Sequence, residues 1–380
     1  MLSEYKKKRI AIMNSPIFDL YVDFLICSTS YTTATALSAA TGNAVSHDKI
    51  TRFLSSRDFT QIDLWQVAKP LVKTLQETDN DEDTDGVLIL DDSIEEKPYT
   101  DENEVISWHY DHCKGRSVKG VNFISAMFNT RKGSSPVSYE PVRKNILVKD
   151  KKTGKEKRKA EVSKQEHFRN LIKVAIKNNV DFKTVLADKW FASVENMVFI
   201  KHDAKKDFIL PIKDNRKVAS SEENLTAGKF VNIKDLELGE GVLVWLEGVD
   251  FPLLLSRHLF KDEDGSTIAL YLVSSNIKLS KKQIRELYQR RWKIEEYHKS
   301  LKNNASLSKS PTKTVRTQLN HLFTSICAFI RLERLSIGSK LNHFALKGKM
   351  YIQSLKTMFK ELQKLKNQIF QTGLTNVAPA

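Results

Sequence analysis

Residues 288–302, YQRRWKIEEYHKSLK, carry four polar side chains whose spacing guides the interpretation of the whole chain. Arg291, Glu295 and Lys302 follow Tyr288 at offsets of three, seven and fourteen residues. At about 100° per residue, the four side chains fall within a sector of roughly 60° on one face of a helix. A glutamate flanked by a tyrosine and two cations on one stripe indicates a site that binds a metal ion and a phosphate.

Two further acids follow short apolar runs that are typical of buried strands. Asp91 comes directly after VLIL, and Asp188 comes directly after TVLA. We expect both acids to lie at strand ends, where a helix carrying Glu295 can bring a third carboxylate to them. Carboxylates are the ligands that Mg²⁺ and Mn²⁺ prefer, and two such ions about 3.5–4 Å apart serve phosphodiester chemistry.

Each of these acids has an alternative reading. Asp92 competes with Asp91 for the first ligand position, and Glu296 competes with Glu295. The helical register with Tyr288 selects Glu295, since Glu296 lies about 100° further round the helix. Asp188 is also placed to act only as the N-cap of a following helix, because aspartate is a preferred N-cap residue.

The positive charge of the chain is concentrated near its end. The net charge is +15, and residues 281–380 contain 20 Lys and Arg against 5 Asp and Glu. The other 280 residues hold the remaining 41 basic and 41 acidic residues, which balance. A cationic region of this strength favours a polyanion as partner, because neutralised phosphates release counterions. A solvated basic face is the alternative.

Composition excludes several classes of protein. The apolar content of 41% and charged content of 28% are typical of a folded domain, and 380 residues are enough for two or three of them. The three cysteines are far apart and match no zinc spacing, which favours a reducing compartment. No apolar run reaches about 18 residues, so we expect no membrane partner and a cytoplasmic location.

Residues 1–76 are predicted to be mostly helical. Gly42 and Asn43 supply a turn between two short helices, and Ser46 is a plausible N-cap for the second. If this pair is a helix-turn-helix, Lys49 and Arg52 point toward DNA. An ordinary helical bundle is an equally good reading of the same pattern.

From Val87 the pattern changes to strands. VNFISAMF (121–128), PVSYEPV (136–142) and FILPI (208–212) are candidate strands, and residues 161–179 form an amphipathic helix. Residues 109–120 are interpreted as a loop. Residues 143–159 hold 9 Lys and Arg, and we expect a loop there that either contacts DNA backbone or is simply solvated.

These residues together make a resemblance specific. The chain resembles DDE transposases of the cut-and-paste bacterial insertion-sequence type, in the group marked by Tyr-x2-Arg-x3-Glu-x6-Lys. All four signature positions are matched in residues 288–302. Asp91 has the Asp-x-Ser context of the first acid, and Asp188 precedes an aromatic as the second acid does.

The resemblance implies an α/β fold: an RNase H-like mixed sheet flanked by helices, with a β-rich insertion before the glutamate helix and helical N-terminal and C-terminal regions. It implies two Mg²⁺ or Mn²⁺ ions held by Asp91, Asp188 and Glu295. The partner is then double-stranded DNA, both the inverted repeats of the element ends and the target, bound by a homodimer in a bacterial, nucleoid-associated setting. The residues expected to contact DNA are Tyr288, Arg291, Lys302, Lys213, Asn215, Arg216, Lys49 and Arg52. Trp245 and Trp292 are candidates to stack on a displaced base, although tryptophan is more often a core residue.

The expected domains follow from these assignments. They are a DNA-end-binding region at 1–76, an acidic linker at 77–86, a catalytic domain at 87–216 and 277–335, a β-rich insertion at 217–276, and a basic helical region at 336–380. Two other functions fit the same residues. One is a nuclease that only hydrolyses DNA, and the other is a DNA-binding regulator without catalysis.

Overall fold

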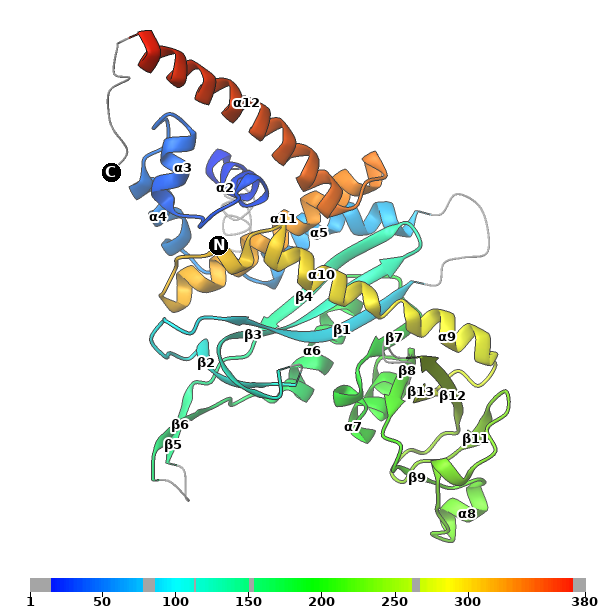
Figure 1. The fold of residues 1–380 in the computed structure, drawn as a ribbon. Coiled ribbons are helices and arrows are strands. Elements are labelled where there is room, and N and C mark those ends of the chain that lie inside the picture. The colour runs from blue at the N-terminus through cyan, green and yellow to red at the C-terminus, as the bar shows by residue number, and fades with distance from the viewer. Residues whose placement is uncertain (1–14, 78–85, 113, 150–153, 262–266, 372–380) are drawn as a thin grey trace.

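A computed structural model describes residues 15–77, 86–112, 114–149, 154–261 and 267–371 (Figure 1). Most of the expected acidic linker, residues 78–85, lies outside these ranges. Within the described ranges, one continuous sheet of nine strands crosses the molecule, and helices pack on both of its faces.

The described strands fall into one large sheet and two small ones. The large sheet contains β1 (Val87–Glu96), β2 (Ile106–Asp111), β3 (Arg116–Thr130), β4 (Gly133–Pro141), β7 (Thr184–Ala187), β8 (Asp207–Ile212), β11 (Val242–Val244), β12 (Leu253–Lys261) and β13 (Thr267–Ser274). The small sheets pair β5 (Ile146–Lys149) with β6 (Glu156–Lys159), and β9 (Lys217–Val218) with β10 (Val231–Asn232).

Strand β1 is central to the large sheet. On one side it pairs with β3 in antiparallel fashion, and β3 pairs in the same way with β4. On the other side β1 pairs in parallel with β7, and β7 pairs in parallel with β8. The order β4-β3-β1-β7-β8, with three antiparallel strands followed by two parallel ones, is the RNase H-like arrangement. The expected fold class is therefore confirmed.

The connections explain why the sheet is mixed. A tight turn at Arg131 and Lys132 joins β3 to β4, as antiparallel neighbours allow. The chain then returns to β7 through α6 (Lys164–Lys177), because parallel strands need a crossover. The side chain of Ser163 caps this helix by accepting a hydrogen bond from the backbone N–H of Glu166.

Several helices pack on the two faces of the sheet, and others pack on those helices. Those described are α2 (Pro16–Cys27), α3 (Ala34–Ala40), α4 (His47–Ser55), α5 (Gln61–Gln76), α6, α7 (Val194–Val198), α8 (Glu222–Thr226), α9 (Lys281–Gln289), α10 (Trp292–Asn303), α11 (Val315–Ser339) and α12 (His343–Gln371). Helices α5, α10 and α11 lie over one face of β1, β3 and β4, and α6 lies over the other (Figure 1). Short helical turns are η1 (Lys189–Phe191), η2 (Phe199–Asp203), η3 (Ile233–Asp235) and η4 (Leu307–Lys309).

Helix α11 joins the N-terminal helices to the sheet. Phe323 of α11 stacks on Phe59 with ring centroids 4.5 Å apart, and His321 Nδ1 lies 3.0 Å from Tyr21 Oη. One continuous apolar core therefore runs from Phe18 to Leu332. The buried residues of α11 include Phe323, Ile326 and Phe329.

The predicted geometry of the two short N-terminal helices is also confirmed. Gly42 and Asn43 both have positive φ, 60° and 64°, and form the turn between α3 and α4. Ser46 is the N-cap of α4, and its hydroxyl accepts from the backbone N–H of Lys49 at 3.3 Å. Both Lys49 and Arg52 are exposed on α4.

Three local predictions were wrong. Asp91 lies within β1 rather than at its end, because β3 extends far enough to pair with β1 as far as Glu96. Residues 109–120 form a β-hairpin of β2 and β3 instead of a loop. Residues 146–149 and 156–159 pair as the β5–β6 hairpin, which projects from the body (Figure 1). Strand pairing with distant residues decided each case, and a local pattern does not reveal such pairing.

Residues 217–276 contain strands that continue the main sheet. Strand β13 pairs with β8, with Ser274 opposite Ile209, and β12 and β11 follow outward. The short pair β9–β10 and α8 lie beyond them. No helix in the described part of the chain is long and apolar enough to cross a membrane.

Asn320→Ala should destabilise the protein by about 3 kcal/mol, since it leaves buried backbone groups without partners. The Asn320 side-chain amide donates to the carbonyls of Leu54 at 2.8 Å and Arg57 at 2.6 Å, and its oxygen accepts from the N–H of Phe59 at 3.1 Å. Urea unfolding measures the change. Arg316→Ala on the same helix is the control and should cost less than about 1 kcal/mol, because Arg316 pairs with Asp58 at the surface. Equal losses in the two variants would contradict this role for Asn320.

Candidate active site

The parallel pairing of β1 and β7 brings two of the predicted acids together. Leu90 and Ala187 are partners in the register of these strands, so Asp91 and Asp188 follow at equivalent positions. Neighbouring strands lie about 4.8 Å apart, which sets the separation of the two backbones. The runs VLIL and TVLA are buried throughout, so both strands lie in the interior of the sheet with both faces covered.

Burial and neighbouring carboxylates disfavour the ionisation of both groups. Burial raises the pKa of Asp91 to about 8, and the neighbouring charges of Asp188 and Asp92 add to this, against the opposing effect of Arg291. Burial also raises the pKa of Asp188, while the backbone N–H of Trp190 opposes the shift. Two acids in this position favour a cation between or beside them.

The structure distinguishes Asp91 from Asp92. Asp92 Oδ2 accepts from Lys164 Nζ at 2.6 Å and from Asn122 Nδ2 at 3.0 Å, so this carboxylate already has two partners. Asp91 Oδ1 accepts from the backbone N–H of Asp92 at 2.9 Å. Asp92 is tied into an ion pair between β1 and α6, which makes Asp91 the better candidate for a ligand.

Asp188 also acts as an N-cap, as the alternative reading proposed. Its Oδ1 accepts from the backbone N–H of Trp190 at 2.9 Å, at the start of η1. This bond uses one carboxylate oxygen and orients the group. Capping and ligand binding are therefore compatible at Asp188.

We had expected the signature segment, residues 288–302, to form one continuous helix. It is divided between two helices instead. Helix α9 ends at Gln289 and α10 begins at Trp292. At the break, the backbone N–H groups of Arg290 and Arg291 bond to carbonyls three residues back, which tightens the turn. The Arg290 guanidinium holds this turn against β3, with Nε donating to Asn129 Oδ1 at 2.8 Å and Nη2 donating to the Asn129 carbonyl oxygen. The two helices nevertheless run nearly in line (Figure 1).

The four signature residues still gather over the same strands. Tyr288 Oη donates to the carbonyl of Ala187 at 3.5 Å, next to Asp188. Lys302 Nζ donates to the carbonyl of Ile94 at 2.7 Å, on the strand that carries Asp91. The segment thus contacts both strands that bear the acids.

Arg291 and Glu295 contact each other. Arg291 Nη2 lies 2.6 Å from Glu295 Oε1, and the arginine side chain is 15% exposed against 39% for the glutamate. Arg291 also influences both Asp91 and Asp188, whose pKa values it lowers. Its charge therefore acts on three carboxylates at once.

A divalent ion fits part of this arrangement. Asp91 and Asp188 offer adjacent oxygen ligands whose mutual repulsion a hard cation relieves. Within the described ranges, no three His, Cys, Asp or Glu side chains lie close enough together to hold an ion. Glu295, which is bound to Arg291, would have to move to join the two acids.

The other predicted DNA contacts lie at two different places. Lys213, Asn215 and Arg216 follow β8, the neighbour of β7, so they lie at the sheet edge where Asp188 lies. A turn bond from the Arg216 N–H to the Lys213 carbonyl shapes this loop. Lys49 and Arg52 on α4 lie at the opposite side of the molecule from β7 and β8 (Figure 1).

Aromatic side chains near the acids were partly missed from the sequence. Trp190 is exposed two residues after Asp188, and its ring lies 5.7 Å from His112, which in turn lies 4.9 Å from Tyr110. Only the proximity of Trp190 to Asp188 in the sequence could have indicated this cluster. Trp292 is 60% exposed beside Arg291, whereas Trp245 is half-buried in a bridge to Ala219.

Comparison with known proteins identifies the family. The family model described as DDE superfamily endonuclease matches residues 16–229, more than half of the chain. The chain belongs to this family. The match covers Asp91 and Asp188 and ends before the signature segment.

The other two comparisons add less. No curated protein matches the chain. Among solved structures, it is similar to a chain of the Drosophila P element transposase strand transfer complex, with 12% identity and a TM-score of 0.27. That similarity covers 61% of this chain and 53% of the other, so it spans about half of the P element protein's length.

Asp91→Asn should raise the unfolding temperature of the metal-free protein at neutral pH, because the buried Asp91 carboxyl, with its pKa raised to about 8, must take up a proton on folding at that pH, and asparagine does not. In the unsubstituted protein, Mn²⁺ at about 100 times its dissociation constant should stabilise the fold by about 2.7 kcal/mol. The variant should lose most of this response. Thermal unfolding with and without Mn²⁺ measures both effects. Glu296→Gln is the control, since Glu296 is exposed and pairs with Lys293, and it should behave as the unsubstituted protein. An unchanged Mn²⁺ response in Asp91→Asn would remove Asp91 from the ligand set.

Proposed function

We propose that this DDE-family protein is a transposase of the cut-and-paste insertion-sequence type. It binds the ends of its element, cleaves phosphodiester bonds there, and joins the freed 3′-hydroxyl groups to target DNA. One observation carries this proposal: a segment with the spacing Tyr-x2-Arg-x3-Glu-x6-Lys lies across the two strands that hold Asp91 and Asp188.

The three acids are proposed as the metal ligands and catalytic residues. Asp91 and Asp188 would hold two Mg²⁺ or Mn²⁺ ions together with Glu295. Bound ions supply an activated water and stabilise the leaving oxygen. The sheet contributes rigid placement, since Asp91 lies in β1 and Asp188 directly follows β7, two hydrogen-bonded strands with buried residues before the acids.

Arg291 links DNA binding to the position of Glu295. Its guanidinium is paired with Glu295 in the DNA-free protein. A phosphate offers the same planar fork a stronger, bidentate partner. When DNA enters, Arg291 is expected to turn to the phosphate beside the scissile bond and release Glu295 toward the aspartates. Tyr288 and Lys302 are expected to contact the same stretch of DNA backbone.

DNA contacts outside the active site are proposed at three surfaces. The helical region 1–76 reads the inverted repeats at the element ends through Lys49 and Arg52 of the α3–α4 pair. The loop with Lys213, Asn215 and Arg216 holds DNA beside the active site. The excess of 15 positive charges in residues 281–380 adds affinity for any DNA sequence.

The domain roles follow the boundaries given above. Residues 87–216 and 277–335 form the catalytic domain, 217–276 the insertion, 77–86 the linker, and 336–380 a basic helical region. The protein acts as a homodimer on DNA in the bacterial cytoplasm, associated with the nucleoid.

Alanine at Asp91, Asp188 or Glu295 should each abolish cleavage and leave binding to the element ends largely intact, because DNA affinity comes from cations elsewhere. The assay is Mg²⁺-dependent nicking and strand transfer on DNA that carries the inverted repeats flanking this reading frame. Glu296→Ala should retain activity. Asp92→Ala is a poor control, since it breaks the ion pair with Lys164. A variant that keeps near-normal nicking identifies a misassigned residue, and nicking without strand transfer favours a nuclease that only hydrolyses.

Arg291→Lys should be defective in cleavage on every end sequence, because an ammonium cannot form the bidentate contact with phosphate. Lys302→Arg keeps the charge and should be the milder change. Rates measured over a range of salt concentrations test this. If Arg291→Lys cleaves at the same rate as the unsubstituted protein at all salt concentrations, Arg291 serves only to hold Glu295.

A further inference from the structure

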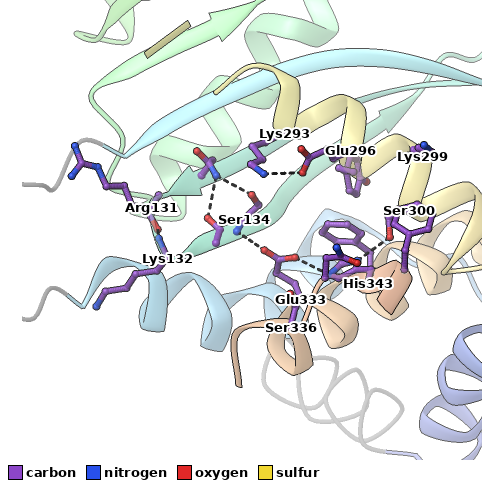
Figure 2. A pocket seen from close by; sticks show the side chains of 17 residues that line it. Arg131, Lys132, Ser134, Lys293, Glu296, Lys299, Ser300, Glu333, Ser336 and His343 are labelled. Atoms are coloured by element: carbon purple, nitrogen blue, oxygen red, sulfur yellow. Dashed lines mark hydrogen bonds and ion pairs between the residues drawn. The ribbon is translucent and has the colours of Figure 1, made fainter. Parts of the chain in front are cut away.

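The first turn of α12 is fixed to the catalytic domain. His343 begins this helix, and its Nδ1 lies 2.8 Å from Ser300 Oγ on α10. Its Nε2 lies 2.8 Å from Glu333 Oε2 on α11. These contacts line a cavity of about 550 Å³ on the side of α10 where Lys293 and Glu296 lie (Figure 2). The helix therefore leaves the body in a direction that α10 and α11 determine.

Beyond its first turns, α12 projects from the molecule with apolar side chains in solvent. The helix has 29 residues, a length of about 40 Å, and runs past α2 and α3 (Figure 1). Met358 is 62% exposed, Leu365 is 56% exposed and Leu362 is 48% exposed. Such a row of exposed apolar residues on one helix indicates a missing partner.

The spacing of this row identifies the kind of partner. Along α12, one stripe of mostly apolar positions recurs at alternating intervals of four and three residues, which is the repeat of the seam between two paired helices. The positions are Phe344, Gly348, Tyr351, Leu355, Met358, Leu362 and Leu365. A helix that covers a broad core has a wider apolar face with a period of 3.6 residues. Ile352 and Phe359, also exposed, adjoin the stripe on one side. The repeat of the stripe fits a facing helix that has the same repeat.

The charges beside the stripe favour the same helix from a second copy. Glu361, the one acidic residue in residues 343–371, flanks the seam on one side, and Lys366 flanks it on the other. In a parallel coiled coil, the residue on Glu361's side of the seam faces the residue five positions later on the partner helix. Glu361 of each chain then faces Lys366 of the other. An antiparallel pair over Leu355–Leu365 would be centred at position 360 and would bring the two copies of Glu361 close together.

We propose that α12 forms a parallel two-stranded coiled coil with α12 of a second copy of this chain, without DNA. The pairing starts near Leu355, after the turns of α12 that lie against Ile26 and Cys27 of α2. It does not depend on the proposed function. Because His343 ties α12 to Ser300 on the helix that carries Glu295, the coiled coil also fixes how two catalytic domains are joined.

Site-specific cross-linking of the full chain tests the pairing and its direction. Leu362→Cys places a thiol on the seam, where the parallel arrangement brings the two copies of position 362 together. Mild oxidation without DNA should convert most of this variant to a disulfide-linked dimer. Lys360→Cys is the matched control, since position 360 lies on the opposite side of the helix and should link little. The unsubstituted chain, oxidised in parallel, measures the background from the native cysteines such as Cys27.

Light scattering without DNA gives the second readout. The unsubstituted chain should be a dimer at micromolar concentration, and Leu362→Glu should be a monomer with an unchanged unfolding temperature of the body. Glu361→Lys should weaken the dimer about tenfold, and the exchange Glu361→Lys with Lys366→Glu should restore it. A monomeric unsubstituted chain, a dimer that survives Leu362→Glu, or equal cross-linking at 360 and 362 would each overturn the proposal.

Discussion

The parallel pairing of β1 with β7 is the constraint on which the site depends. It holds two carboxyl groups at neighbouring strand positions, where burial and mutual repulsion oppose their ionisation. Such an arrangement is costly in free energy unless positive charge is supplied. The surrounding structure supplies it with Arg291 for the pair itself and Lys164 for the adjacent Asp92. The acids therefore determine which cations the nearby helices must carry.

The break between α9 and α10 helps to place the positive charge of Arg291 beside the acids. Arg290 is turned toward β3 and bonds to Asn129, while Arg291 is turned toward the acids. Consecutive residues of a regular helix point about 100° apart, and the tightened turn lets both guanidinium groups reach partners on the sheet. Tyr288 before the break and Lys302 after it then contact different strands.

Features set by short stretches of sequence were predictable. The buried runs before Asp91 and Asp188, the turn at Gly42 and the cap at Ser46 all follow from local side-chain chemistry. Features set by distant pairing were not. The β2–β3 hairpin forms because β3 is long enough to pair with β1, β2 and β4, and no local signal marks that length. Arg291 and Glu295 have the i, i+4 spacing of an ordinary ion pair on a helix. The sequence alone therefore did not indicate that Arg291 also acts on the two aspartates.

The packing of the N-terminal helices on α11 has a consequence for synthesis. Helices α2 to α5 are translated before α11, yet part of the surface that buries Phe18, Tyr21 and Phe59 belongs to His321 and Phe323 of α11. Part of the apolar surface of these helices therefore stays unburied until α11 has been translated. A product that ends before α11 lacks the helix on which α2, α4 and α5 pack. Only a chain that includes α11 can therefore hold the α3–α4 pair in the position described here.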